Sequence, residues 1–230
     1  MSLTELPYES IQGLWQEVLA AIDFIDVHGE LPLAREEFYR LRGKPVPADP
    51  FYDAYMNIFL EWFLIERPVN QGNSPLFTLL QRGTSFSAET VASLHYLLGS
   101  HHSLFEVMTP WKKDFFWLRD LIYGDDWLVS HWPPFPGIDP GQPMECRLVF
   151  FQDKVCLTPG IVVFPFSARD AVHSVIAECK KDMLLPDIMN LLSKMSIRSF
   201  RFSHLDPKRF FHLDDPMVKD LLHKQSTGDQ

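Results

Sequence analysis

Histidine and carboxylate side chains are the groups in this chain whose types and spacing could support metal-dependent chemistry. His95, His101 and His102 lie close together in the sequence, and Glu106 follows them. Imidazole and carboxylate groups bind zinc when two or three of them converge on the ion at about 2 Å. A helix that placed His95 and His102 on one face would have to continue through the Gly-Ser pair between them. We therefore expect helix-end histidines that interact with the helix dipole.

A second group of histidines and aspartates lies near the C-terminus and comprises His204, Asp206, His212, Asp214 and Asp215. Its spacing matches no metal-ligand pattern, and the HExxH motif of zinc proteases does not occur in the sequence. We therefore expect neither a metal nor a cofactor.

Two glutamates in an aromatic-rich segment could act as an acid–base pair. Glu61 and Glu66 are five residues apart, which in an α-helix places them roughly 140° apart around the axis. At that angle they do not face one substrate together. We instead expect an ion pair between Glu66 and Arg67, or contacts at the helix end beside Pro68.

The sequence lacks the motifs of common nucleotide-binding and hydrolase sites. Neither GxxxxGK[ST] nor GxGxxG occurs, and no GxSxG would present a nucleophilic serine. The three cysteines, Cys146, Cys156 and Cys179, are odd in number and lack CxxC spacing, which favours buried free thiols. These observations predict a non-enzymatic protein with no catalytic residues. An enzyme of unrecognised type that uses the His-Glu group described first is an alternative.

Charge is distributed unevenly along the chain. The whole chain has 21 Lys and Arg against 30 Asp and Glu, a formal net charge of −9, which argues against a dedicated nucleic-acid-binding protein. Residues 193–230 are the exception, with 7 basic and 5 acidic side chains, a net of +2. We expect any attraction to an anionic partner to come from this segment.

Basic and aromatic residues are interleaved within this segment, between Lys194 and His212. The basic members are Lys194, Arg198, Arg201, Lys208 and Arg209, and the aromatic members are Phe200, Phe202, Phe210 and Phe211. The alternation of Arg and Phe is typical of an edge strand whose phenylalanines face the core. The same composition suits an acidic protein partner, or single-stranded nucleic acid whose bases stack on the rings. The predicted binding residues here are Arg198, Arg201, Phe202, Lys208 and Arg209.

A proline-rich loop carries two further candidate binding residues. Residues 131–136 read HWPPFP, and Trp132 and Phe135 on such a stiffened loop would lose little entropy on binding. Trp132 could equally fold back over the predicted sheet.

Two periodicities divide the chain into helical and extended parts. Apolar residues at three- and four-residue steps, with caps or prolines at their ends, predict helices. These helices cover Tyr8–Val27, part of 35–44, Phe51–Glu66, Pro75–Gln81, 87–98, and two segments that start at Ser167 and Pro186. Short apolar runs between turns predict strands at Leu104–Met108, Phe115–Leu121, Trp127–Ser130, Cys146–Phe151, Val155–Leu157 and Ile161–Phe166.

The order of these elements predicts an α+β fold. Helices come first, a small antiparallel sheet or barrel follows, and helices return after it. Parallel strands would need crossover helices between them, and none fits. We divide the chain into a helical region at 1–102, a β unit at 103–166 and a C-terminal helical region at 167–230, which could form one integrated domain.

The segment Phe59–Pro75, which reads FLEWFLIERPVNQGNSP, resembles part of an uncharacterised bacterial protein family. In that family a helix ending in WFL-x-x-RP precedes a Gly-x-Ser/Thr-Pro turn. The similarity continues through Ser103–Val107 and Leu118–Leu121, where the relatives have a strand ending in DL-x-x-G. The resemblance implies a helical segment that leads into a small β unit, and it carries no assigned reaction.

Composition and the N-terminal residues bear on the cellular location of the protein. Hydrophobic residues make up 46% of the chain, which is typical of a folded globular protein. No apolar run reaches the roughly 20 residues of a membrane span, and the acidic N-terminus is unlike a signal peptide. We expect a cytoplasmic, non-enzymatic protein that acts through contacts with another protein. A nucleic-acid-associated module that uses residues 194–212 is the main alternative.

Overall fold

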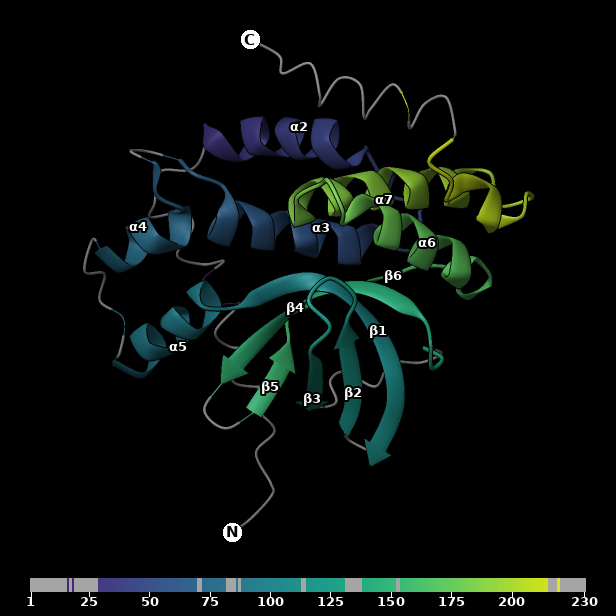
Figure 1. The fold of residues 1–230 in the computed structure, drawn as a ribbon. Helices are drawn as coiled ribbons and strands as arrows, with labels where there is room; N and C mark the ends of the chain where they lie inside the picture. The colour runs from purple at the N-terminus through teal and green to yellow at the C-terminus, as the bar shows by residue number, and fades with distance from the viewer. Residues whose placement is uncertain are drawn as a thin grey trace.

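A computed structural model describes residues 16, 18, 29–69, 72–81, 86, 88–112, 115–130, 138–151, 154–214 and 219. Within these residues the fold is α+β, as the sequence predicted. Helices lie against one side of a curled antiparallel sheet (Figure 1). The helix predicted at 8–27 lies almost wholly outside the described residues.

The sheet consists of antiparallel strands that curl into a half-barrel (Figure 1). Its strands are β1 (His101–Lys112), β2 (Phe115–Asp120), β3 (Asp126–Ser130), β4 (Pro143–Phe151), β5 (Lys154–Leu157) and β6 (Val162–Val163). They lie in the order β3-β2-β1-β4-β5, and β6 also pairs with β4. The register of β1 against β2 shifts twice between Val107 and Lys112, and such irregularities increase the local twist of a sheet.

The first five strands match the predicted segments, except that Leu121 lies in the turn after β2, whereas the strand predicted at 161–166 is much shorter. The observed β6 is only two residues long, and the 3-10 turn η4 (Phe166–Ala168) follows it closely. Pro165 lies between them and has no backbone N–H to donate to a ladder, so it ends the extended segment.

Alternation along the central strands separates the two faces of the sheet. Phe105 of β1 and Cys146 of β4 pack with other strand residues in one apolar cluster. Leu104, next to Phe105, packs instead among residues of the C-terminal helices. Val149 of β4 belongs to a third cluster, which is formed mainly by the N-terminal helices. The residues of β1 and β4 that share a face with Leu104 and Val149 therefore point toward the helices.

Helices from both ends of the chain lie on this side of the sheet, some in direct contact with it and others packed on those helices (Figure 1). They are α2 (Glu30–Arg42), α3 (Tyr52–Glu61) with its π-helical continuation η2 (Trp62–Glu66), α4 (Pro75–Gln81), α5 (Ala88–Leu98), α6 (Arg169–Cys179) and α7 (Leu185–Arg201), and the 3-10 turn η5 (Pro207–Phe210) follows α7. Among the helices described, none combines the length and apolar character needed to cross a membrane.

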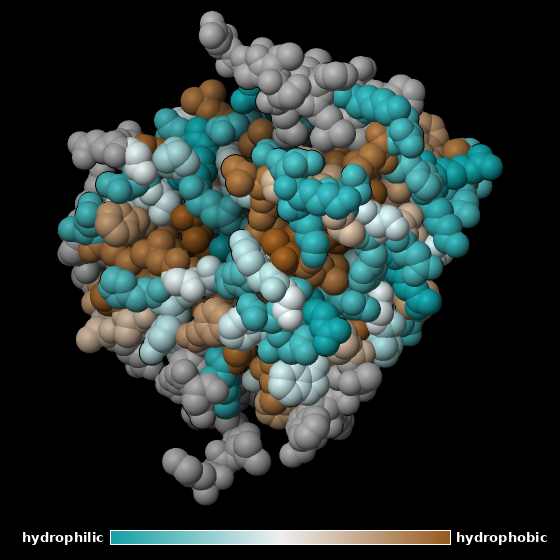
Figure 2. Space-filling view, viewed as in Figure 1, coloured by the Kyte–Doolittle hydropathy of each residue, from teal (hydrophilic) through white to brown (hydrophobic). Residues whose placement is uncertain are grey.

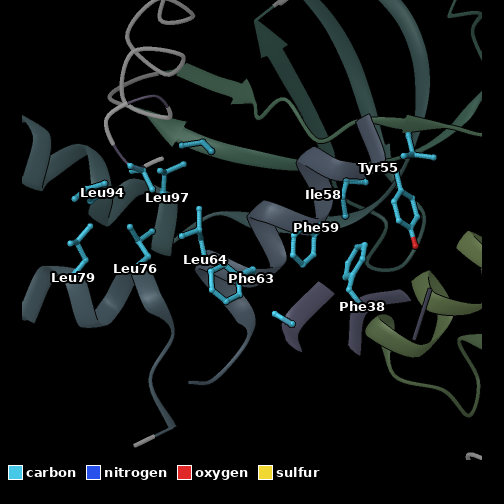
Figure 3. Packing of buried hydrophobic residues seen from close by; sticks show 14 of the residues in the cluster. Phe38, Tyr55, Ile58, Phe59, Phe63, Leu64, Leu76, Leu79, Leu94 and Leu97 are labelled. Atoms are coloured by element: carbon cyan, nitrogen blue, oxygen red, sulfur yellow. The ribbon is translucent and has the colours of Figure 1, made fainter. Parts of the chain in front are cut away.

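An aromatic core joins α2 to the helix made by α3 and η2 (Figure 3). The ring of Phe38 lies 5.3 Å from Tyr55 and from Trp62, and 5.4 Å from Phe59, between ring centroids. Phe63 is completely buried in the same cluster. The aromatic-rich helix predicted at 51–66 is confirmed, and it is central to the fold.

The Arg-Phe alternation near residue 200 does not form the edge strand that its pattern suggested. Arg198–Arg201 is the last turn of α7. Apolar residues at three- and four-residue steps from Ile188 to Met195 already favour a helix, and no proline or glycine follows that would end it before Phe202. The helical period therefore continues into the basic segment.

We expect Phe63→Ala to lower the free energy of unfolding by about 3–5 kcal/mol, because it opens a cavity in the aromatic core. Phe77→Ala is a matched control, since it removes the same ring from a position that is 40% exposed. It should cost less than about 1 kcal/mol. Urea denaturation measures both, and equal losses would contradict the central position of Phe63.

Candidate functional site

Six ionisable side chains lie between the helices and the sheet and form a network of ion pairs and hydrogen bonds. We call them the charged cluster; its members are Arg42, Glu61, Glu66, His102, Glu145 and Arg147. Glu66 is partly exposed, and the side chains of the other five are almost completely removed from solvent. A buried charge without a partner is costly, so the pairing within this cluster constrains how the helices lie on the sheet.

The sheet supplies three members through strand alternation and register. Glu145 and Arg147 are two residues apart on β4, so their side chains lie on the same, helix-facing side. His102 of β1 is the direct partner of Arg147 across the antiparallel ladder. The imidazole therefore lies beside both β4 side chains.

The helices supply the other three members. Arg42 lies in the last turn of α2 and donates a hydrogen bond to Glu145. Glu61 ends α3, and Glu66 ends η2. Arg147 contacts both of these carboxylates: its Nη2 donates to Glu66, and its Nε lies 3.5 Å from Oε2 of Glu61.

The prediction that Glu61 and Glu66 point apart is wrong, because the helix changes type between them. In η2 the backbone N–H of Arg67 donates to the carbonyl of Trp62, five residues earlier, at 2.8 Å. A π turn is wider than an α turn, so it brings residues five apart toward one face. The sequence could not reveal this change, because every residue of the segment is also compatible with an α-helix.

Arg67, directly after this turn, pairs with α2 instead of with its neighbour. Its Nη1 lies 3.0 Å from Glu30, and its Nε lies 2.8 Å from Glu37. The predicted ion pair between Glu66 and Arg67 is therefore wrong, since Glu66 is turned toward the sheet. The two neighbours fasten the end of η2 to different parts of the protein.

His102 links two carboxylates through both of its ring nitrogens. Nδ1 lies 2.8 Å from Oε1 of Glu66, and Nε2 lies 2.9 Å from Oε1 of Glu145. Ionised carboxylates only accept hydrogen bonds, so a neutral ring would leave one nitrogen lone pair facing a negative oxygen. The doubly protonated ring satisfies both contacts, and it carries a positive charge.

The pKa values of these groups follow from that arrangement. Burial and the charge of Arg147 lower the pKa of His102, but the hydrogen bonds to Glu145 and Glu66 outweigh them and raise it overall. Burial raises the pKa of Glu66, but His102 and Arg147 together bring it down to about 2. The pairing therefore keeps Glu66 ionised and His102 protonated.

Glu61 is the member whose negative charge is least well compensated. Burial raises the pKa of its carboxyl despite the charge of Arg147. One oxygen accepts the N–H of Gly160 at 2.7 Å, while Oε2 has no hydrogen-bond donor. This close approach requires a glycine, because a Cβ at position 160 would come within 2.6–2.8 Å of the carboxylate.

The charged cluster is suited to fastening elements together. Its three cations, counting His102 as protonated, face three carboxylates, so the charges balance when all are ionised. Arg42 and Glu145 connect α2 to β4, and Arg147 connects β4 to the helix that ends at Glu66. The groups are directed mainly at one another, which is the pattern of a structural ion-pair network.

His101 and His102 alternate across β1, so the predicted histidine group is divided between the two faces of the sheet. His101 Nε2 lies 2.7 Å from Oδ2 of Asp120, and Ser103 donates to the other oxygen of the same carboxylate at 3.1 Å. The serine thus bonds the carboxylate and not the imidazole, unlike the catalytic triad of serine hydrolases. Asp120 also accepts two backbone N–H groups of the following turn.

The expectation of helix-end histidines holds for His95, which lies in the last turn of α5, and is wrong for His101 and His102. The strand β1 starts at His101, three residues before the predicted strand, and therefore includes both histidines. Glu106 faces His173 of α6 at 4.0 Å. In the part of the chain that the structure describes, no group of three or more His, Cys, Asp or Glu side chains is placed to hold a metal ion.

The three cysteines are free and buried, as the sequence predicted. Burial raises the pKa of Cys156 and of Cys179 to about 11, and it raises that of Cys146 well above the ordinary value. Protonated thiols are poor nucleophiles, so these cysteines are expected to be unreactive.

Five of the seven predicted binding residues lie at the C-terminal end of α7. Arg198 and Arg201 are in its last turn, Phe202 follows directly, and Lys208 and Arg209 are in η5. The ring of Phe202 stacks on a phenylalanine of η5 at 5.9 Å, with 12° between the planes. The fold therefore brings the two basic parts of this segment together.

The other two predicted binding residues, Trp132 and Phe135, lie outside the described residues. Their place in the proline-rich loop remains a prediction.

Lys44, from a distant part of the sequence, meets this group through its backbone. Arg201 donates a hydrogen bond to the carbonyl of Lys44, which follows α2. Gly43 lies directly against α7, since a Cβ there would come within 3.0 Å of Ile197. Sequence reasoning missed Lys44, because no local signal links it to α7. We call the exposed group the basic surface; its members are Lys44, Arg201, Phe202, Lys208 and Arg209.

Most phenylalanines of the basic segment belong to the core. Phe210 and Phe211 are buried, and Phe200 packs on Phe51 with 4.6 Å between ring centroids. Phe202 differs from these three, because it is 46% exposed. The four rings therefore do not form a platform on which successive bases could stack.

In comparisons with protein-family models, curated proteins and solved structures, nothing matches this chain. The resemblance of Phe59–Pro75 to a bacterial family stays a prediction.

The contacts of His102 predict a specific dependence of stability on pH. Its pKa in the folded protein is raised above the ordinary 6.5, so its contribution is complete below about pH 6.5. That contribution is lost as the pH rises through the folded-state pKa. We expect His102→Gln to lower the free energy of unfolding by about 2 kcal/mol at pH 6, and to remove this alkaline loss.

Urea denaturation between pH 6 and pH 9 measures both effects. His204→Gln is the matched control, because His204 is exposed beyond the end of α7. It should leave the stability and its pH dependence close to those of the wild type. A His102→Gln variant that kept the full alkaline loss would refute the assignment.

Gly160→Ala tests the close approach to Glu61. The added Cβ would displace a buried carboxylate from its donor, and we expect a loss of about 1–3 kcal/mol in the free energy of unfolding. Gly29→Ala meets nothing within 4 Å and should stay within about 0.5 kcal/mol of the wild type. Thermal and urea unfolding compare them, and a neutral Gly160→Ala would contradict the contact.

Proposed function

We propose that this chain is a non-enzymatic protein of the bacterial cytoplasm that acts by binding another protein through the basic surface. The observation that carries the proposal is a set of exposed cations around an exposed ring in a chain of net charge −9. Aromatic residues and Arg are enriched at the centres of protein interfaces. Lys208 and Arg209 are exposed, and neither makes an ion pair with a carboxylate among the described residues.

The internal contacts support binding over catalysis. Arg42, His102 and Arg147 are directed at carboxylates inside the protein. His101 and Ser103 share one carboxylate in place of forming a nucleophile–base pair. Groups that are committed to such contacts have little freedom to act on a substrate.

The arrangement of the phenylalanines favours a protein over nucleic acid as the partner. Binding of single-stranded nucleic acid without sequence preference commonly uses several rings, on which successive bases stack. Of the four phenylalanines in this segment, Phe202 alone is exposed. One ring among several cations is better matched to a polypeptide.

A pull-down from extract of the native host tests the proposal, with bound proteins identified before and after nuclease treatment. Three baits are compared: the wild type, Lys208→Glu with Arg209→Glu, and the control Lys180→Glu with Lys181→Glu. Both double variants change the net charge equally, and both alter exposed sites. The control pair lies between α6 and α7, near the start of α7, whereas the basic surface lies at the other end of that helix. The 17 residues of α7 span about 25 Å.

We expect a defined set of proteins that survives nuclease, persists with the control bait and is lost with the Lys208/Arg209 variant. Binding that disappears after nuclease treatment would contradict the proposal and favour the nucleic-acid alternative. Equal retention by all three baits would show that the basic surface is not the contact site.

A further inference from the structure

We infer that the partner presents an acidic segment of polypeptide, and that an apolar side chain of that segment packs on Phe202. This inference rests on the proposed function and adds the chemistry of the partner. Three features of the described residues carry it: the positions of the cations, the exposed ring that follows Arg201 in the chain, and the contacts that hold the backbone in place.

The cations of the basic surface come from two chain segments that are distant in sequence. Lys44 follows α2, whereas Arg201 ends α7 and Lys208 lies in η5. The hydrogen bond from Arg201 to the carbonyl of Lys44 spans 157 positions of the sequence and fixes the two segments side by side. A carboxylate-rich segment that crosses this junction would meet Arg201 from one segment and, from the other, Lys44, whose ammonium lies over the ring of Tyr39 at 5.8 Å from its centroid.

The ring of Phe202 provides an apolar contact at the same place. It follows the last turn of α7 and stacks on Phe210, whose other neighbours include the guanidinium of Arg198 at 5.7 Å from the ring centroid. Phe210 is buried on one side of the stack, and about half of Phe202 stays exposed on the other. An aliphatic side chain flanked by carboxylates would bury this ring while its neighbours pair with the cations.

The backbone of this surface is held in place before any partner binds. The side chain of Asp206 accepts the N–H of Lys208 at 3.0 Å and caps η5. Phe210 and Phe211 anchor the end of η5 in the core, where Phe211 lies 6.2 Å from Phe164 between ring centroids. Such preorganisation reduces the entropy lost on binding.

Hydrophilic side chains predominate over the C-terminal end of α7, with single hydrophobic ones among them (Figure 2). This mixture differs from the apolar character of obligate interfaces. It suits a partner that is held by charge and oriented by a single apolar contact.

Fluorescence anisotropy with the full chain tests the inference. The probe is a short labelled peptide rich in Asp and Glu with one central Leu, and the control peptide carries Asn and Gln in their place. The wild type should bind the acidic peptide, and added salt should weaken binding because exposed charges are screened.

Three variants separate the contributions to binding. Lys208→Glu with Arg209→Glu should weaken binding on the order of tenfold, and Phe202→Ala should weaken it severalfold while leaving the salt dependence intact. Lys180→Glu with Lys181→Glu should bind like the wild type. Circular dichroism checks that each variant is folded; if the Lys208/Arg209 variant were not, Phe202→Ala and the salt titration would decide.

Several results would overturn the inference. The acidic and amide peptides could bind equally, or a single-stranded oligonucleotide could bind more tightly through the same residues. Sedimentation could also show that the surface pairs two copies of this chain. If the acidic peptide did not bind while the pull-down still depended on Lys208 and Arg209, the inferred acidic partner would be wrong and the proposed function would stand. If both failed, the proposed function itself would be wrong.

Discussion

Arg147 reaches from β4 to two carboxylates on one helix, and the packing of the helices on the sheet depends on this contact. Its guanidinium is buried, so both partners must lie on the same side of the helix. The π turn after Glu61 meets this requirement by bringing Glu66 round to the sheet. His102 and Arg42 then extend the pairing to Glu145, which ties α2 to the same strand. π turns are rare and often mark functional sites; here the turn serves the balance of buried charge.

This internal pairing explains the contrast between the inside and the outside of the protein. The ionisable groups nearest to one another, which would be the first candidates for acid–base chemistry, stabilise the junction of helices and sheet. The exposed cations of the basic surface take no part in the charged cluster. Their junction with Lys44 exists because α2 packs along α7, so the same helix that carries Arg42 into the charged cluster also brings Lys44 to the surface.

The sequence predicted most elements of the fold, because they depend on local patterns. The apolar steps of 51–66, the capping signals around 75–98 and the short apolar runs between turns all correspond to observed helices and strands. The charged cluster was not predicted, since it depends on register and on a change of helix type. Arg147 pairs with His102 only through the ladder between β1 and β4, and no spacing in the sequence encodes that. The basic segment was recognised as a binding candidate, yet its Arg-Phe alternation suggested a strand, because a two-residue pattern at a helix end is ambiguous.

We propose that binding occurs at the basic surface and that the charged cluster has a purely structural role. A backbone amide NMR titration of the full chain with the acidic peptide tests this most directly. We expect chemical shift changes to concentrate at Lys44 and at residues 201–210, and the amides of Glu66, His102 and Arg147 to stay unchanged. Changes centred on the charged cluster, with none at the end of α7, would contradict it and would show that the ligand engages the buried groups.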